Sequence, residues 1–226
     1  MHWNDIFDNF DFLMNGLIAT IEVAGISVLG SLILGVILGI IRYSKAFPFN
    51  VVAVIYIESI RSIPLILFIV FVHFGFLPFL LGSSSSVFQS TYVALIIFTS
   101  AYVAEITRGG LKSVENGYVD AAKSLGMNYF QRLIYIVLPL AISRMTPALV
   151  SQFISLIKDT SLASTIGLIE LTRAGEIIYE RTYHEFEILL FIALVYFLVC
   201  FGLSTLSKKL ESKPFIYAES EIMQTN

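Results

Sequence analysis

Residues 16–41 form an apolar run that contains a single charged side chain, Glu22. About 20 helical residues, rising about 1.5 Å each, cross the roughly 30 Å of hydrocarbon in a bilayer, so this run is long enough to span a membrane. Only 14% of the chain is charged and 57% is hydrophobic, whereas about 25% of the residues in an average soluble domain are charged. The sequence therefore predicts an all-α membrane protein.

Further apolar stretches complete a single transmembrane domain over residues 1–226, with about five membrane-spanning helices. They are predicted at about residues 16–41, 49–76, 91–111, 145–168 and 188–206. A loop at about residues 113–139 separates the third and fourth helices, and a polar tail follows at residues 207–226. We expect Pro139 to close this loop and Pro147 to open the fourth helix. Pro64 lacks a backbone N–H, so it should kink or restart the second helix.

Small residues repeat along the first predicted helix. Ser27, Ser31, Gly35 and Gly39 follow one another at intervals of four residues. Such spacing places them on one face, where small side chains let two helices approach closely in a membrane. We interpret this stripe as a packing surface rather than as part of a substrate site.

Charge and cysteine content exclude several classes of protein. The net charge of −3 gives no reason to expect a nucleic-acid partner. Cys200 is the only cysteine, so no intrachain disulfide can form. A cleavable signal peptide would begin with basic residues, but the N-terminal segment carries Asp5, Asp8 and Asp11. The first helix is therefore expected to direct membrane insertion itself.

The distribution of Lys and Arg predicts how the helices are oriented in the membrane. Five spans put ten of these residues on one side and two on the other. Basic residues in short loops favour the cytoplasm, so the side with ten should be cytoplasmic. The N-terminus is then predicted outside, and the loop at residues 113–139 and the C-terminus inside. The ten are Arg42, Lys45, Arg108, Lys112, Lys123, Arg132, Arg144, Lys208, Lys209 and Lys213, and the two are Arg173 and Arg181.

Two short helices are predicted within the loop at residues 113–139. Asn116 can cap the first, and Gly126 can end it in the left-handed conformation. Asn128 and Gln131, three residues apart, have the spacing of a capping box that begins the second. The result is a compact pair of helices joined at a glycine.

The same loop resembles a known family signature. Its residues resemble, with Asp in the place of Glu, the Glu-Ala-Ala motif of permease subunits in bacterial ATP-binding-cassette importers. In that family the segment is a cytoplasmic coupling helix seated in a groove of the ATPase subunit. The resemblance implies a type I importer permease fold in which six residues serve ATPase coupling. They are Asp120, Ala121, Ala122, Gly126, Ile136 and Pro139. The alternative is an amphipathic connector between two membrane helices.

The fourth predicted helix is the least apolar of the five. Lys158, Asp159, Thr160 and Ser161 stand together in it, and such polar groups in a membrane segment should face protein or a water-filled path. Residues 158–167 also resemble the fourth-span motif of the polar amino acid branch of the family, which contributes to the translocation path. We therefore expect Asp159, Thr160 and Ser161 to face the path. Mutual neutralisation of Lys158 and Asp159 is the alternative.

Glu58 and Arg61 are a second pair of candidate path residues. They are three residues apart on one helical face, which predicts a local ion pair. With the apolar residues that follow Pro64, this stretch resembles the second-span motif of polar amino acid permeases. The alternative is an interfacial pair that anchors the end of a helix.

No motif for ATP hydrolysis occurs in the sequence. Residues 109–113, GGLKS, lack the Gly-Lys step of a phosphate-binding loop. No His/Cys cluster suggests a metal site, and no hydrolase motif is recognisable. The chain is therefore predicted to be a non-catalytic permease subunit without a cofactor of its own, which depends on a separate chain for energy.

The resemblance also implies an assembly in the bacterial inner membrane. It would contain a second permease subunit, identical or paralogous, two subunits that bind ATP and Mg, and an extracytoplasmic substrate-binding protein, with membrane lipid around the helices. The implied substrate is a polar amino acid; we favour glutamine or a similar one, and the sequence does not separate it from a cationic one such as arginine.

Two other functions remain as alternatives. A proton-coupled secondary carrier could use Glu22, Glu58 and Asp159 as titrating groups. A membrane scaffold or assembly factor that transports nothing would explain a docking loop but not the polar fourth helix. His184, in the polar connection before the last helix, is expected to be a solvated loop residue.

Overall fold

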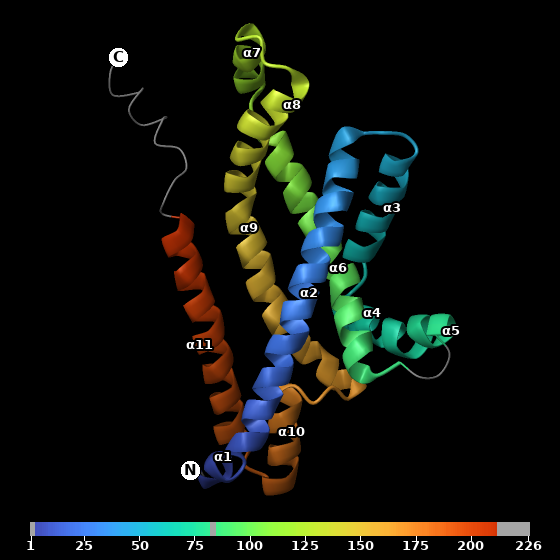
Figure 1. Cartoon of the computed structure of the whole chain (residues 1–226). Helices are drawn as coiled ribbons and strands as arrows, with labels where there is room; N and C mark the ends of the chain where they lie inside the picture. The colour runs from blue at the N-terminus through green and yellow to red at the C-terminus, as the bar shows by residue number, and fades with distance from the viewer. Residues whose placement is uncertain (1–2, 82–84, 212–226) are drawn as a thin grey trace.

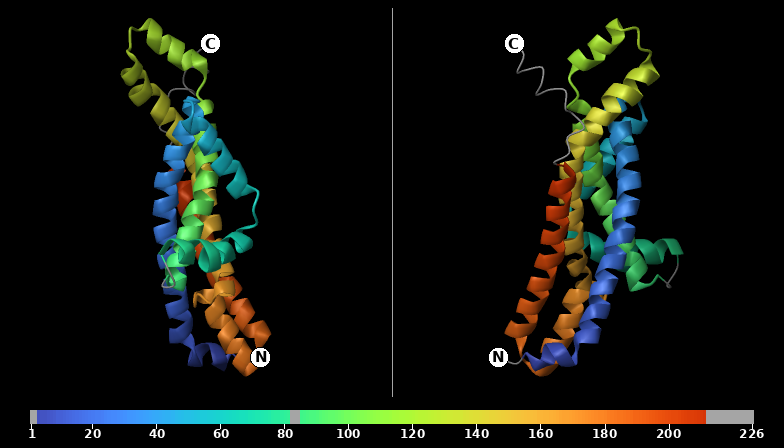
Figure 2. Two further views of the ribbon diagram at one scale, coloured as in Figure 1. Left: turned by 90° about the vertical axis from the view of Figure 1, so that its right-hand side faces the viewer. Right: turned by 60° about the vertical axis from the view of Figure 1, so that its left-hand side comes forward.

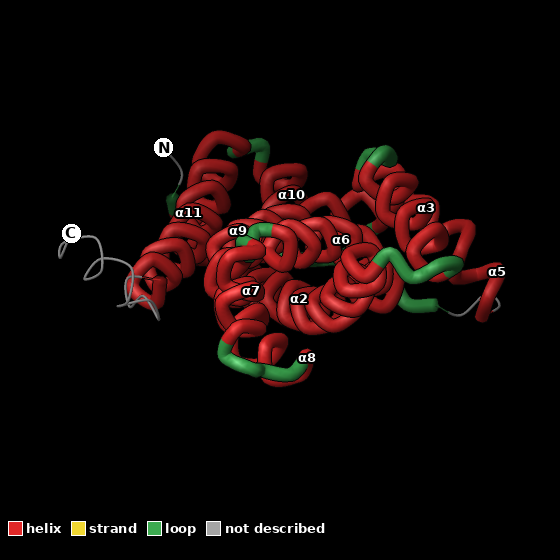
Figure 3. Tube along the Cα trace, turned by 90° about the horizontal axis from the view of Figure 1, so that it is seen from above, coloured by secondary structure: helices red, strands yellow, loops and turns green. Residues whose placement is uncertain are grey.

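The structure is a computed structural model that describes residues 3–81 and 85–211, and all regular elements of that part are helical (Figures 1 and 3). Four long helices run along an elongated bundle: α2 (Phe10–Ser44), α6 (Val87–Lys112), α9 (Leu138–Asp159) and α11 (Glu185–Glu211). The shorter α-helices are α1 (Asn4–Asp8), α3 (Phe49–Arg61), α4 (Leu65–Phe71), α5 (Leu77–Leu81), α7 (Asn116–Ser124), α8 (Tyr129–Arg132) and α10 (Leu171–Thr182). The π-helical segments η1 (Val72–Phe76) and η2 (Leu133–Val137) and the 3-10 segment η3 (Thr160–Ile166) complete the set. The predicted all-α class is confirmed.

Four described helical segments are long and apolar enough to cross a membrane, and a bent pair makes a fifth if it counts as one span. The four are Phe10–Ser44, Val87–Lys112, Tyr129–Ile166 and Glu185–Lys208. The bent pair joins Phe49–Arg61 to Leu65–Leu81. This agrees with the prediction of about five membrane helices.

The bend lies where the sequence places Pro64. The helix direction bends by 107° between the two parts of the pair. Pro64 itself is extended, with φ −60° and ψ 132°. The predicted restart at this proline is therefore confirmed. The bend is large enough that residues 49–76 are not one straight span: α3 lies along the bundle, while α4, η1 and α5 project sideways from it (Figures 1 and 2).

The predicted packing stripe on α2 faces α6. Ser27, Ser31, Gly35 and Gly39 are all buried, and α6 packs against α2 more extensively than any other element does. Gly35 shows why small residues are needed, because a Cβ atom there would lie 2.5 Å from the Cβ atom of Val103. In a membrane, where lipid is as apolar as a side chain, such close packing is a main source of helix association.

The fourth predicted span begins earlier than the sequence suggested. We expected Pro139 to close the loop and Pro147 to open the helix, but the helix runs without a break from Tyr129 to Ile166, and Pro147 lies inside α9. A proline ring crowds the carbonyl four residues before it. The wider turns of η2 end two residues before Pro139, which accommodates this proline without ending the helix.

A further helix, α10, lies in the segment that the sequence presented only as a polar connection. Its apolar face, Leu171, Ala174 and Ile178, packs with Leu13 of α2 and Ile188 of α11 in a separate hydrophobic cluster. This cluster also includes α1, so α1 and α10 close one end of the bundle, while α7 and α8 extend beyond the other end (Figures 1 and 2).

Candidate coupling segment and substrate path

Residues 116–132 form the coupling segment, in which α7 and α8 are joined at Gly126. Gly126 has φ +78°, the left-handed conformation expected for it. Its N–H donates to the Lys123 carbonyl at 2.9 Å, and the Met127 N–H donates to the Ala122 carbonyl at 3.1 Å. These two bonds make a Schellman motif, which satisfies the last carbonyls of α7. The two helices are thus fixed at a defined angle.

The predicted capping box at the start of α8 is confirmed. The Gln131 N–H donates to Asn128 Oδ1 at 2.9 Å, and the Asn128 N–H donates to Gln131 Oε1 at 2.9 Å. The predicted cap of α7 is not seen, because α7 begins at Asn116 itself and Glu115 occupies the capping position without a side-chain bond. The backbone geometry of the turn is therefore set mainly by Gly126 and the capping box.

The six residues predicted for coupling differ in exposure. Ala122 is buried, Ile136 and Pro139 are half-buried, and Asp120, Ala121 and Gly126 are exposed. The Asp120 carboxylate accepts a hydrogen bond from Lys123 Nζ at 2.7 Å, and both side chains are more than half exposed. In this chain Asp120 is already paired within α7, so it does not present an isolated negative charge.

Three exposed apolar side chains lie on the coupling segment, and none of them was predicted as a site residue from the sequence. Leu125 is 82% exposed, Phe130 70% and Tyr129 64%. We call these three the apolar docking patch. The rings of Tyr129 and Phe130 meet edge to face, 5.7 Å apart. The sequence did offer a sign of this patch: three large apolar residues flank a glycine turn in a segment that is otherwise rich in polar groups.

Two arginine side chains donate to backbone carbonyls in and beside the coupling segment. An Arg132 guanidinium N–H donates to the Met127 carbonyl at 2.6 Å. Arg144 of α9 donates to the carbonyl of Ser113, just after the end of α6. The first bond therefore stabilises the turn within the coupling segment, and the second joins α9 to the end of α6 beside it.

The polar motif of the fourth span lies at the junction of α9 and η3. Asp159 and Ser161 are half-buried, and Lys158 is exposed. Thr160 is fully buried, and its hydroxyl donates to the Ile157 carbonyl at 2.7 Å. The Ser161 hydroxyl donates to the Lys158 carbonyl at 2.7 Å. The three predicted path residues are thus adjacent, but Thr160 faces the protein interior.

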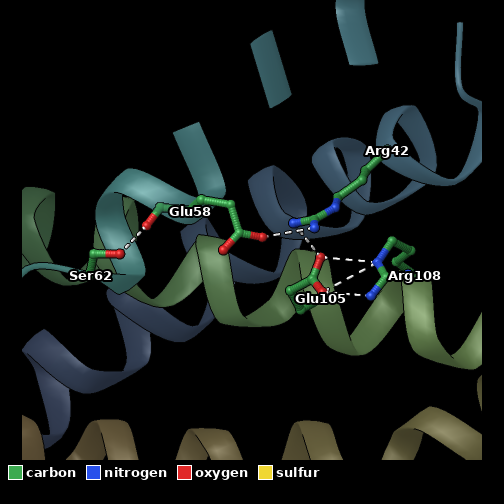
Figure 4. Close-up of polar contacts among 5 residues, drawn as sticks. All are labelled: Arg42, Glu58, Ser62, Glu105 and Arg108. Atoms are coloured by element: carbon green, nitrogen blue, oxygen red, sulfur yellow. Dashed lines mark hydrogen bonds and ion pairs between the residues drawn. The ribbon is translucent and has the colours of Figure 1, made fainter. Parts of the chain in front are cut away.

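Glu58 and Arg61 do not form the ion pair that their spacing predicted. Instead Glu58 Oε1 lies 2.8 Å from Arg42 Nη2 of α2 (Figure 4). The Arg61 guanidinium lies over the Tyr102 ring, 5.3 Å from its centroid. The prediction was wrong because α2 and α6 pack beside α3 and offer each residue a partner from another helix, which the helical spacing alone cannot show.

A charge network ties α2, α3 and α6 together. Besides Glu58, Arg42 contacts Glu105 with Nη1 2.7 Å from Oε1, and Arg108 Nη2 lies 2.8 Å from Glu105 Oε2 (Figure 4). The side chains of Arg42 and Glu105 are only 16% and 17% exposed. The signal available in the sequence was the three-residue spacing of Glu105 and Arg108.

The structure separates the two sets of predicted path residues. In the described part of the chain, the polar contacts of Glu58 and the ring contact of Arg61 involve α2, α3 and α6 rather than α9 or η3. The two predicted sets therefore do not converge on a shared site within this subunit.

His184 is not the solvated residue expected. It does lie in the loop between α10 and α11, but its Nδ1 is 2.6 Å from Asp5 Oδ2, and both side chains are partly buried. Arg181 donates to Asn9 Oδ1 at 2.7 Å beside it. These contacts hold the N-terminal helices against the α10–α11 connection.

Comparison with known proteins identifies the family. Residues 31–215 match the family described as binding-protein-dependent transport system inner membrane component. The chain belongs to this family. The description agrees with the apolar helices of the structure, so the protein is a multi-pass protein of the inner membrane.

Individual relatives match almost the whole chain. The probable glutamine ABC transporter permease protein GlnP of Bacillus subtilis strain 168 is 42% identical over 207 residues, which cover 90% of this chain and 94% of the relative. The glutamine transport system permease protein GlnP of Escherichia coli K12 is 34% identical over 212 residues, covering 93% and 96%. A crystal structure of an amino acid ABC transporter with histidines superposes with a TM-score of 0.88 at 33% identity, covering 95% of this chain and 99% of that one.

Proposed function

We propose that this chain is the permease subunit of an ATP-driven importer for a polar amino acid, with glutamine as the first candidate. The projecting, glycine-closed coupling segment is the structural observation that carries the proposal (Figures 1 and 2). The 42% identity to a glutamine permease supports the substrate class. The chain would form half of the translocation path, and the other half would come from a second permease subunit, identical or paralogous.

The coupling segment would dock onto an ATPase subunit. The apolar docking patch supports this, because large exposed apolar residues at the projecting end of the molecule favour a partner surface (Figure 1). The excess of Lys and Arg at the same end favours a cytoplasmic position, with the N-terminus outside. The six residues predicted for coupling would shape this contact: Gly126 and the buried Ala122 by fixing the turn, and exposed Asp120 at its edge.

The chain itself would be non-catalytic and hold no cofactor. ATP and Mg would bind to two partner ATPase subunits, and an extracytoplasmic binding protein would deliver the amino acid at the end formed by α1 and α10. ATP-driven closure of the ATPase pair would move the coupling segments, and rotation of the helical bundles would open the path to each side in turn.

Asp159 is the residue that we assign to the substrate. It is half-buried near the end of α9, and its carboxylate could attract the ammonium group that every amino acid carries. Lys158 and Ser161 would line the same region. Glu58 and Arg61, with their partners in α2 and α6, would stabilise the C-terminal end of α3 rather than contact the substrate.

Uptake by the reconstituted complex tests the function directly. The chain is placed in vesicles with its ATPase and binding protein, and radiolabelled glutamine uptake is measured with ATP inside and with unlabelled amino acids as competitors. We expect uptake that needs ATP and survives collapse of the proton gradient. Uptake that survives loss of ATP and stops with the proton gradient would support the proton-coupled carrier instead.

Copurification tests the coupling segment. Phe130→Ala and the double variant Asp120→Arg with Gly126→Pro should recover less ATPase than the wild type from membranes in mild detergent. Phe49→Ala is the matched control, because Phe49 is 66% exposed at the start of α3, comparable with 70% for Phe130. Equal recovery for all variants at equal insertion would mean that the coupling segment is only a connector.

Substitution of Asp159 tests the path. Asp159→Asn keeps the size of the side chain but removes its charge, so we expect uptake to fall while the complex still assembles. Asp11→Asn is the control, because Asp11 is exposed at the start of α2. Unchanged uptake in Asp159→Asn would remove Asp159 from the path.

A further inference from the structure

A fully buried carboxylate, Glu170, begins the helix that follows the path motif. Its side chain is 0% exposed. Glu170 Oε1 accepts from the Arg173 N–H at 2.8 Å, and Oε2 accepts from the Thr172 N–H at 2.8 Å, so the carboxylate caps α10. The Tyr196 hydroxyl of α11 donates to Oε2 at 2.9 Å. Glu170 therefore joins the start of α10 to α11.

Tyr196 also reaches the other end of η3. Its hydroxyl interacts with the side chain of Thr160, the first residue of η3 and the neighbour of Asp159. The Thr172 hydroxyl lies 3.3 Å from the same Tyr196 oxygen. One phenol group thus contacts both the residue that begins η3 and the residue that caps the following helix, α10.

Helix α2 contacts the start of α10 from the side opposite α11. Thr20 Oγ1 accepts from the Leu171 N–H at 3.1 Å and donates to the Gly16 carbonyl at 3.0 Å. A Cβ atom at Gly16 would lie 3.0 Å from the Glu170 carbonyl oxygen, a tight contact that would push the two backbones apart by a few tenths of an ångström. The start of α10 is consequently attached to both α2 and α11.

The position of the Asp159 carboxylate depends on the backbone around it. Among the described residues, this carboxylate has no hydrogen-bond or ion-pair partner. Where it points is then determined by where the end of α9 and the start of η3 are held. η3 is held by Ala163 and Ile166, which are buried in the hydrophobic cluster with residues of α4 and α6, and by the polar contacts of Thr160, Glu170 and Tyr196 on the side of α11.

We propose that Glu170 and Tyr196 are positioning residues that fix η3 and thereby keep Asp159 in place on the translocation path. This inference rests on the proposed role of Asp159 in that path. A displacement of α11 relative to α9 would move Asp159, so the network also links the packing of α11 to the substrate site.

Cysteine labelling tests whether the network holds η3. In a Cys200→Ser background, a cysteine placed by Ser161→Cys is labelled with a water-soluble maleimide. Adding Tyr196→Phe removes the hydroxyl and should raise the labelling rate about three- to tenfold, the range expected for loss of a hydrogen bond. The matched control is Tyr56→Phe, because the Tyr56 hydroxyl makes 2.8 Å bonds to Ile97 and Ser100 in another part of the bundle.

Transport stoichiometry tests whether the network positions Asp159. With the native Ser161, amino acid taken up per ATP hydrolysed is measured in reconstituted vesicles. This ratio does not depend on the fraction of folded protein, so a purely structural defect would leave it unchanged. We expect Tyr196→Phe to lower it about three- to tenfold, and Tyr56→Phe to leave it at the wild-type value.

The outcomes separate this inference from the proposed function. Absence of uptake by the wild type would overturn the proposed function, and the labelling rates would still decide whether Tyr196 holds η3. A wild-type labelling rate in Tyr196→Phe would overturn the network. Faster labelling with an unchanged ratio of uptake to ATP hydrolysis would overturn the positioning role.

Discussion

Replacement of Gly35 by alanine probes the close contact between α2 and α6. The added Cβ atom would lie 2.5 Å from the Val103 Cβ atom and 2.8 Å from the Ser100 carbonyl oxygen. The carbonyl belongs to the backbone of α6, so the clash cannot be relieved by a rotamer change alone. The α2 and α6 helices must therefore move apart, and the whole of α6 must shift with its backbone.

The expected cost can be worked from these distances. Overpacking a well-packed interior costs about 1–3 kcal/mol, and alanine gains about 0.5–1 kcal/mol over glycine within a helix. Gly35→Ala should therefore destabilise the fold by a net value of up to about 2.5 kcal/mol. Gly25 lies in the same helix, and a Cβ atom there would meet nothing within 4 Å. Gly25→Ala should then stabilise by about 0.5–1 kcal/mol.

Thermal unfolding in one detergent, at one scan rate, checks the difference. In a protein of this size about 1 kcal/mol corresponds to about 2–4 °C, so the midpoint should fall by up to about 10 °C for Gly35→Ala and rise by about 1–4 °C for Gly25→Ala. Gly39→Ala should behave like Gly35→Ala, because its Cβ atom would lie 2.6 Å from the Thr107 Cβ atom. Equal midpoints for Gly35→Ala and Gly25→Ala would refute the argument that small residues set the distance between α2 and α6.

Two further predictions concern charged groups. Arg42→Gln should lower the free energy of unfolding by about 1–3 kcal/mol, since it leaves Glu58 and Glu105 without their shared partner. Arg108→Gln should cost less, because Arg108 is more exposed and, among the described residues, forms an ion pair with Glu105 alone. An equal or larger loss of thermal stability in Arg108→Gln would contradict this. Burial raises the pKa of the Glu170 carboxyl above its ordinary value of 4.5, so between 4.5 and the raised pKa the folded state holds a proton that the unfolded state has lost. Stability should therefore fall as the pH rises through that window, and a pH series of thermal midpoints should show a weaker fall in Glu170→Gln; parallel curves would contradict it.

Features set by neighbouring residues could be predicted from the sequence. The restart at Pro64, the left-handed Gly126 and the capping box of Asn128 and Gln131 each depend on the chemistry of a few consecutive residues. A missing N–H, a missing Cβ atom or a short polar side chain changes the backbone conformation within about one helical turn. This effect is therefore nearly the same in any fold.

Features that join distant segments could not be predicted in this way. Asp5 and His184 meet across 179 positions of the chain, and Arg42 takes the partner that helical spacing had assigned to Arg61. Several helices packed around one side chain offer it several possible partners, and the sequence pattern records only those on its own helix. For the same reason, the role of Tyr196 beside the path motif becomes visible only once the fold brings α11 next to Glu170 and Thr160.

The continuity of the helix from residue 129 to residue 166 has a consequence for coupling. It contains 38 residues, which corresponds to about 57 Å at about 1.5 Å per residue if the helix is straight. It begins with the exposed rings of α8 and continues past Asp159 into η3. If Pro147 had opened a new helix, a flexible joint would separate these ends. Because the helix is unbroken, a displacement of α8 by an ATPase partner would be carried along one continuous helical element to Asp159, beyond which Glu170 joins the start of α10 to Tyr196 of α11. Movement of α8 at the start of this helix would then also change the position of the Asp159 carboxylate near its end.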